Sequence, residues 1–282
     1  MGVPSPVPFR EIAPVLNPAP QGKRLFVLLT FYADESYNDH TFNFGGWLAD
    51  ESVWSRLESQ WERRLDFERR KHGKLERFHA THCNRLDGDY RGWDKASQVE
   101  HTVALLEIIK RRKNILAVCA GLDVDAMRRV YSDTPKDWKP DAYKVTVTQL
   151  MIMVASYVKK DSGHRVAIIH DWAGGYNGVI ADAFTAQQDN PQWKHRELFT
   201  TIAPMKWQDR TALQAADMIA FDTFKLLDQT LHADTAKMRR SLQSLLKGQI
   251  PIKARYISEL VLLKLREMRS SPSSSAGRAA VS

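Results

Sequence analysis

The chain has 282 residues, of which 43% are hydrophobic and 26% charged, so it can bury a sizeable core and is not a disordered polyelectrolyte. Its 41 basic residues exceed its 33 acidic ones, and the net charge of +8 favours a polyanionic partner such as nucleic acid. Two cysteines and no apolar run of ~20 residues argue against a disulfide scaffold and a membrane protein, so we expect a cytoplasmic protein.

The two ends of the chain differ in composition from the middle. Residues 1–22 are proline-rich, lack the pattern of a signal peptide and predict an extended, flexible arm. Residues 269–282 are rich in serine and predict a disordered tail. Between them, residues 23–268 are expected to form one domain.

The first half of that domain predicts two strands followed by two helices. Apolar residues over 24–33 and 41–49 predict strands joined by a polar loop. A helix starting at Asp50 or Ser52 is expected to end near Gly73, and a second is expected over about 96–112. The apolar residues at helical spacing are Trp54, Leu57, Trp61 and Leu65 in the first helix and Val99, Val103, Leu106 and Ile109 in the second.

The second half alternates strands with helices. A helix starting at Pro140 is expected to face inward through Val147, Leu150, Val154 and Tyr157. Strands are predicted over 114–124, 164–171 and 197–204, and further helices over 211–228, 236–247 and 253–268, with a short helix after the glycines of 174–178. This order predicts an α/β fold in which helices flank one mixed sheet, with a helical insertion after the second strand and helices at the C-terminal end.

Two of the predicted strands end in an acid. LFVLLTFYAD ends in Asp34 and HRVAIIHD ends in Asp171, at the strand ends where α/β sheets collect ligands. Asp217 lies within the apolar helical segment TALQAADMIAF, where an unpaired carboxylate is costly to bury. Taken singly, such acids cap helices, form turns or pair with an arginine such as Arg210. Together, they are the oxygen ligands that Mg²⁺ or Mn²⁺ needs for phosphodiester cleavage.

Four short segments carry a resemblance to a known family. They are DES at 34–36, FNFGGWLA at 42–49, ERFHA at 76–80 and LQAADMIA at 213–220. In this order, they resemble the domain-of-unknown-function family 3800, whose members are similar to the ribonuclease H-like superfamily of metal-dependent nucleases and integrases. The resemblance covers roughly residues 25–228 and implies a ribonuclease H-like fold. It departs from the family at Tyr37, where glycine is common.

The resemblance implies a set of metal ligands. Asp34, Asp171 and Asp217 match the family's first-strand, middle-strand and helix acids. Glu35 also belongs to the motif, but strand alternation points it away from Asp34, so it is expected to bind metal only if the strand has already ended.

Further candidate residues come partly from the resemblance and partly from the sequence itself. A fourth acid is expected, for which Glu76 is preferred and Asp141 is the alternative. His79 is a candidate for proton transfer to the leaving group. Gln214 could orient a ligand or a water. His79, His82 and Cys83 could instead suggest zinc, but they lack a second pair of ligands.

The expected function is that of a Mg²⁺- or Mn²⁺-dependent nuclease acting on DNA or RNA. Trp172 and Trp207 lie beside the predicted site and could stack on bases, although core packing is the ordinary alternative. A second hypothesis is a catalytically inactive nucleic-acid-binding or scaffold protein, in which Arg210, Lys206 or backbone donors neutralise the acids. A third is a phosphatase or nucleotide hydrolase. The sequence leaves the oligomeric state open.

Overall fold

The computed structural model describes residues 27–131, 137–158, 163–233 and 235–270. The arm expected over 1–22 therefore lies outside the described residues, as does the tail from 271 on. The described residues form a six-stranded mixed sheet in the order β5-β4-β1-β2-β3-β6. Its strands are β1 (Val27–Tyr37), β2 (Thr41–Asp50), β3 (Leu116–Asp123), β4 (His164–Asp171), β5 (Phe199–Met205) and β6 (Ile252–Ile257).

Strand β1 lies in the middle of the sheet and separates two kinds of pairing. On one side it pairs antiparallel with β2, which in turn pairs antiparallel with β3. On the other side it pairs parallel with β4, and β4 pairs parallel with β5. The carboxyl ends of β1, β4 and β5 therefore meet at one edge of the sheet. The expected α/β class with a mixed sheet is confirmed.

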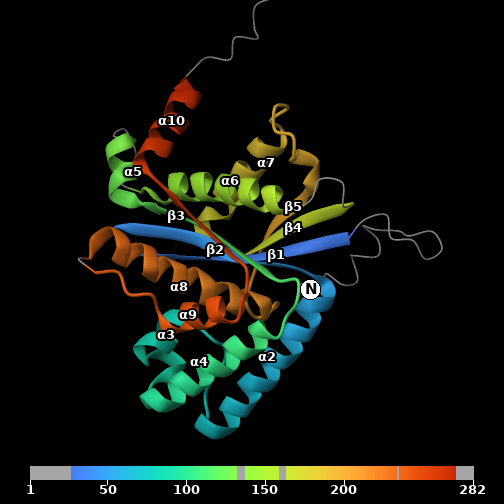
Figure 1. Ribbon diagram of the computed structural model, residues 1–282, viewed down its shortest axis with the longest axis vertical. Coiled ribbons are helices and arrows are strands. Elements are labelled where there is room, and N and C mark those ends of the chain that lie inside the picture. The colour runs from blue at the N-terminus through green and yellow to red at the C-terminus, as the bar shows by residue number, and fades with distance from the viewer. Residues whose placement is uncertain (1–26, 132–136, 159–162, 234, 271–282) are drawn as a thin grey trace, which may run out of the picture.

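Helices cover both faces of the sheet, as Figure 1 shows. One layer contains α2 (Glu51–His72), α3 (Ala80–Arg85), α4 (Lys95–Lys110), α8 (Ala212–His232) and α9 (Arg240–Lys247). The other contains α5 (Val124–Val130), α6 (Lys139–Tyr157), α7 (Asn177–Gln188) and α10 (Glu259–Ser270). Among the described residues, no helix combines the length and apolarity needed to span a bilayer.

Aromatic side chains fill the core beneath α2. Trp54, Leu57, Trp61 and Leu65 are fully buried, so the predicted inward face of this helix is confirmed. The indole of Trp54 donates to the carbonyl oxygens of Thr30 (3.1 Å) and Ala49 (3.2 Å). Each indole adds a large apolar area, and the hydrogen bonds remove the cost of burying its N–H group. These contacts fix α2 against β1 and β2.

Helix α8 packs against the sheet where Gly121 of β3 faces it. A Cβ added to Gly121 would lie 2.4 Å from Cδ2 of Leu227, so a larger residue there would require the Leu227 side chain to move. Two side chains of β2 then donate to helix carbonyls. Nδ2 of Asn43 lies 2.9 Å from the Ala220 oxygen, and Nε1 of Trp47 lies 2.8 Å from the Ala215 oxygen. These bonds set the rotation of α8 and turn Asp217 toward β1.

The C-terminal part departs from the sequence expectation. The helix predicted over 253–268 is wrong in its first part, because Ile252–Ile257 forms β6 and α10 begins only at Glu259. Strand β6 pairs parallel with β3, where it supplies partners for backbone groups that would otherwise lie on an open edge. Helix α10 extends to Ser270, so the tail boundary predicted at 269 falls inside a helix.

Two predicted inward faces are also partly wrong. Val99 and Val103 of α4 are exposed, whereas the helix buries His101 and Leu105. The reason is the burial of a polar contact between His101 and Glu68 of α2, which apolar spacing cannot reveal. Tyr157, the last residue of α6, is exposed because the helix ends there.

Candidate functional site

The two acids of β1 lie beyond the end of its neighbour β4. The ladder between β1 and β4 stops at the pair Ala33 and His170, while β1 continues alongside β2 as far as Tyr37. The expectation that the strand ends at Asp34 is therefore wrong. By alternation, Asp34 lies on the α8 side of the sheet and Glu35 on the α6 side, where it interacts with Tyr143.

The other two acids approach from β4 and α8. Asp171 is the last residue of β4. Asp217 lies in the second turn of α8, and its Oδ2 accepts a hydrogen bond from the backbone N–H of Ala80 at 2.8 Å. This N–H belongs to the first residue of α3, so the segment preceding α3 holds the Asp217 carboxylate in place.

One pocket with a volume of about 330 Å³ brings these acids together. Its lining includes Asp34, Glu35, Asp171 and Asp217, which come from three elements of the fold, β1, β4 and α8. The remaining lining residues are Ser36, Tyr37, Arg77, Phe78, His79, Thr81, Trp207, Leu213 and Gln214. We call this cavity the acidic pocket. Glu35 belongs to it although β1 has not ended, because the pocket wraps around the unpaired edge of β1.

The acids of the pocket lack strong basic partners. Within the described ranges, Asp34, Glu35 and Asp171 form no ion pair, and Asp217 faces only Nδ1 of His79 at 3.5 Å. Arg210, the partner considered for Asp217, instead lies 3.5 Å from Glu51 and 3.3 Å from Glu58. The charge of Arg77 acts on Asp171 and Asp217 without forming an ion pair with either.

Burial and mutual repulsion raise the pKa values of the four carboxyl groups. Burial raises the pKa of Asp217 to about 7, with the Ala80 N–H and Arg77 opposing this and Asp171 adding to it. Burial likewise raises the pKa of Glu35 to about 6, although Tyr143 opposes the rise. The pKa of Asp34 is raised by burial and then by the charges of Glu35, Asp217 and Asp171. Burial also raises the pKa of Asp171.

The donor set fits a hard divalent cation. Oε2 of Glu35 is buried and has no hydrogen-bond partner, and the other donors are also carboxylate oxygens, which Mg²⁺ and Mn²⁺ prefer. A cation would stabilise the charged carboxylates against the burial and repulsion that raise their pKa values. Within the described part of the chain, no three His, Cys, Asp or Glu side chains converge as a metal-ligand group.

Glu76 and Asp141, the two candidates for a fourth acid, do not line the pocket. The Glu76 side chain is exposed, while its backbone N–H donates to Asp89 at 2.8 Å. Asp141 lies in the first turn of α6, 3.9 Å from Lys144. The structure therefore brings Glu35 rather than Glu76 to Asp34, Asp171 and Asp217.

His79 does lie in the pocket, stacked on His82 with 4.2 Å between the ring centroids. Burial, followed by the charge of Arg77, lowers the pKa of His79 to about 4. The imidazole is therefore neutral at neutral pH and a weak base, whereas the sequence suggested a proton donor. The sulfur of Cys83 lies 3.7 Å from Oγ1 of Thr102, which gives no support to a zinc site with His79 and His82.

Sequence reasoning missed how the wall of the pocket is held. Oε1 of Gln214 accepts hydrogen bonds from Nε1 of Trp61 (3.1 Å) and from the N–H of Phe78 (2.8 Å). Gln214 thereby fixes the segment that carries Arg77 and His79, rather than serving only as a ligand-orienting group. Its position three residues before Asp217 is the one signal in the sequence that marked it.

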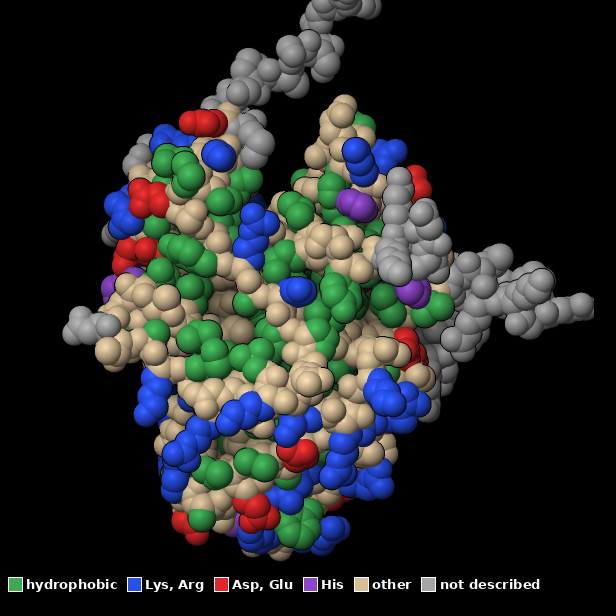
Figure 2. Space-filling view, viewed as in Figure 1, with side chains coloured by type: hydrophobic (Ala, Val, Ile, Leu, Met, Phe, Trp, Pro, Cys, Tyr) green, Lys and Arg blue, Asp and Glu red, His purple; other side chains and the backbone are tan. Residues whose placement is uncertain are grey.

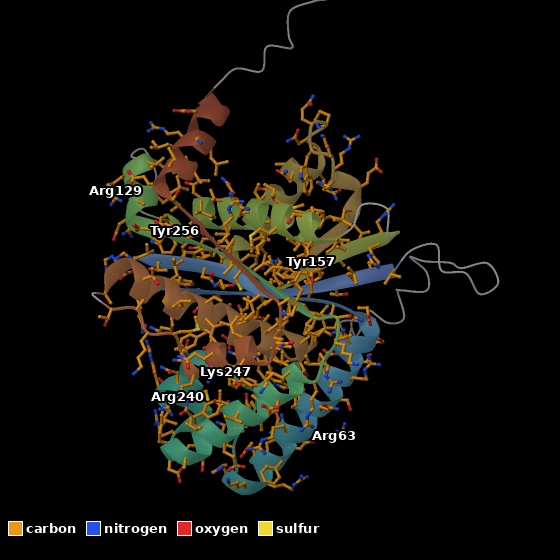
Figure 3. The ribbon with its side chains drawn as sticks, viewed as in Figure 1. Arg63, Arg129, Tyr157, Arg240, Lys247 and Tyr256 are labelled. Atoms are coloured by element: carbon orange, nitrogen blue, oxygen red, sulfur yellow. The ribbon has the colours of Figure 1, made fainter. Side chains whose placement is uncertain are left out.

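Much of the basic excess lies away from the acidic pocket. Figure 2 shows many Lys and Arg side chains over the layer that contains α2, α4 and α9. Arg63 of α2 and Arg240 and Lys247 of α9 are exposed there, and Figure 3 labels all three. The net charge of +8 thus does not by itself concentrate positive charge at the pocket.

Comparisons with known proteins add no family assignment. No protein-family model matches the sequence, and no curated protein matches it either. Function is therefore inferred from the geometry and chemistry of the acidic pocket.

Proposed function

We propose that this protein is a Mg²⁺- or Mn²⁺-dependent nuclease that hydrolyses phosphodiester bonds in DNA or RNA. The observation that carries the proposal is the meeting of four carboxylates in one pocket without a Lys or Arg ion pair among the described residues. Buried carboxylates are normally paired or bound to a cation, because an isolated buried charge is costly.

We further propose a ribonuclease H-like fold and a relationship to the domain-of-unknown-function family 3800. Support comes from the mixed sheet, in which β1 lies between an antiparallel and a parallel neighbour. It also comes from the positions of the acids, since Asp34, Asp171 and Asp217 stand on β1, β4 and a helix packed across the sheet.

Each residue of the pocket has a role that follows from its place. Asp34, Asp171, Asp217 and Glu35 would hold the cation, which polarises a phosphoryl oxygen and makes bound water more acidic. The Ala80 N–H keeps the Asp217 carboxylate oriented. Arg77, at the pocket wall, can bind a phosphate oxygen of the substrate.

The neutral imidazole of His79 lies at the same wall. Its Nδ1 is buried and has no hydrogen-bond partner among the described residues. Because its pKa is lowered to about 4, His79 is a weak base, and its role is to orient a water or substrate group by hydrogen bonding rather than to abstract a proton.

The proposal is tested by cleavage of labelled single-stranded and duplex DNA and RNA with Mn²⁺ or Mg²⁺. The wild type is compared with Asp34→Asn and Asp217→Asn, and with Asp182→Asn as a matched control, since Asp182 is an exposed acid of α7 outside the pocket. We expect the two pocket variants to lose at least ~100-fold in rate and the control to keep wild-type activity.

Equal rates in the wild type and in folded Asp34→Asn would contradict the proposal, because the cleavage would then not depend on the pocket. A wild type that cleaves no polymer would also contradict it. In that case, a Mn²⁺-dependent rise in melting temperature together with hydrolysis of free nucleotides identifies a small-substrate hydrolase. Binding of nucleic acid without any effect of Mn²⁺ identifies a non-catalytic protein.

A further inference from the structure

We infer that the substrate of the acidic pocket is single-stranded nucleic acid, held by stacking of unpaired bases on aromatic side chains at the pocket mouth. This inference rests on the proposed function and names its substrate class. It is carried by three side chains, Tyr37, Trp172 and Trp207, which we call the aromatic rim.

Two rings of the aromatic rim line the acidic pocket, and Trp172 adjoins it through Asp171. Tyr37 ends β1 three residues after Asp34, Trp172 directly follows Asp171, and both Tyr37 and Trp207 line the pocket. Trp172 is 54% exposed and Tyr37 43% exposed. All eight tryptophans of the chain lie within the described residues, and Trp172 is the only one of them that is exposed. Aromatic rings left in water beside a polar pocket are available to stack on a ligand.

Each ring of the aromatic rim has a cation beside it. The Arg77 guanidinium lies 4.8 Å from the centre of the Trp207 ring, and Nζ of Lys206 lies 5.9 Å from that of Trp172. Nζ of Lys139 lies 4.4 Å from the centre of the Tyr37 ring and 3.1 Å from its hydroxyl oxygen. Aromatic rings with cations beside them offer surfaces for both the bases and the phosphates of a nucleic acid strand.

The shape and the chemistry both favour a single strand over a duplex. Bases within a duplex are already stacked on their neighbours, so their faces are not free for Trp172 or Tyr37. The four acids also lie within a cavity rather than on an open surface. A duplex, with a persistence length of about 50 nm, resists the bending that would bring a phosphate into the cavity. A flexible single strand can enter it.

The inference is tested by equilibrium binding, measured as fluorescence anisotropy of labelled oligonucleotides in a cleavage-deficient Asp34→Asn background. Single-stranded DNA, single-stranded RNA and the corresponding duplexes of the same sequence are compared. Trp172→Ala and Trp172→Phe are added to this background, with Tyr157→Ala as the matched control. Tyr157 is 50% exposed but lies at the far end of α6, beside the first residues of β1 and β4 (Figure 3).

We expect at least one single strand to bind about 10-fold more tightly than its duplex. Trp172→Ala should weaken binding of that strand by about 5- to 100-fold, the loss expected for one base–aromatic stack. Trp172→Phe should retain most of the affinity, and Tyr157→Ala should change it by less than about 2-fold. Comparison of the DNA and RNA strands shows which backbone is preferred.

Duplex binding that is equal to or tighter than single-strand binding would overturn the inference. The inference would also be overturned if Trp172→Ala bound the strand no more weakly than Tyr157→Ala. That result is expected if the aromatic rim contacts a protein partner instead. Failure of the inference is distinct from failure of the nuclease proposal. Duplex cleavage that is lost in Asp34→Asn would support the nuclease proposal and overturn the single-strand inference. Selective single-strand binding without cleavage would support the single-strand inference and overturn the nuclease proposal.

Discussion

Asp217 and Asp222 lie five residues apart on α8, but their surroundings are opposite. Asp222 is buried, and its Oδ1 accepts a hydrogen bond at 2.7 Å from Nε of Arg239, which also donates to Asn84. Asp217 shares its pocket with three other carboxylates. Among the described residues it accepts a hydrogen bond from the Ala80 N–H, lies near the neutral His79 and forms no ion pair with an arginine. Two acids of α8 thus differ, because the segment before α9 brings Arg239 to Asp222 and no arginine contacts Asp217.

A second buried acid confirms this difference. Glu68 of α2 forms a hydrogen bond with Arg64 and lies 3.5 Å from both His72 and His101. Burial acts to raise its pKa, but the contact with His101 and the charge of Arg64 hold the pKa below its usual value. Within the described residues, Glu68 and Asp222 each contact an arginine, whereas Asp34 and Asp217 form no ion pair with Lys or Arg.

The largest expected effect on stability comes from Asp222→Asn. This change removes the charge that faces Arg239 while keeping the shape of the side chain. We expect the free energy of unfolding to fall by about 2 kcal/mol, because one member of a largely buried ion pair then lacks its counterion. The measurement is denaturant unfolding in the presence of a chelator. An unchanged midpoint would show that Arg239 contributes nothing through this pair.

The same substitution at Asp217 should act in the opposite direction. In metal-free protein near pH 8, Asp217→Asn removes one of four mutually repelling charges, and its amide oxygen can still accept the Ala80 N–H. We expect the free energy of unfolding to rise by about 1 kcal/mol. Unfolding under the conditions used for Asp222→Asn provides the comparison. Equal destabilisation by both substitutions would remove the distinction between the two acids.

The pocket acids and Glu68 should give pH dependences of opposite sign. The pKa values of Asp217 (about 7) and Glu35 (about 6) in the folded protein lie above those of unfolded chains, so the folded state binds more protons between about pH 4 and 7. Stability of the metal-free protein should therefore fall as the pH rises through this window.

Glu68 provides the contrast within the same titration. Its pKa is lowered in the folded protein, so its contribution to stability is present above the ordinary glutamate pKa and is lost as the pH falls. Chemical unfolding from pH 4 to 8 with a chelator measures both effects. Asp217→Asn should flatten the decline at higher pH without changing the loss on the acidic side. A wild-type curve that rises steadily to pH 8 would contradict the raised pKa values.

Apolar patterns predicted the parts of the fold that depend on local sequence. The spacing of Trp54, Leu57, Trp61 and Leu65 located α2, and the run ending in Asp171 located β4 with its bounds. The pattern failed for β6, because Ile252–Ile257 becomes a strand only by pairing with β3 far away in the sequence. It failed at Val99 for a similar reason, since the buried contact between His101 and Glu68 sets the rotation of α4.

Part of the candidate site could likewise be predicted from local sequence, and part could not. Asp34, Asp171 and Asp217 were marked by their positions relative to apolar segments, and they line one pocket. Glu35 joins them because β1 extends past the end of β4, a consequence of register between strands. Glu76 was chosen from its neighbours in the sequence, but its side chain turns to solvent while its backbone bonds to Asp89. Neither the strand register that brings Glu35 to the pocket nor the outward orientation of Glu76 can be read from the local sequence.

The most direct test is the anomalous scattering of manganese in crystals of the wild type and of Asp34→Asn, both soaked in Mn²⁺. We predict at least one wild-type peak in the acidic pocket, about 2.0–2.2 Å from oxygens of Asp34 and of Asp171 or Asp217, and no such peak in Asp34→Asn. A wild-type pocket without a manganese peak, in which Arg77 instead pairs with the carboxylates, would contradict the proposal that these acids hold a catalytic cation.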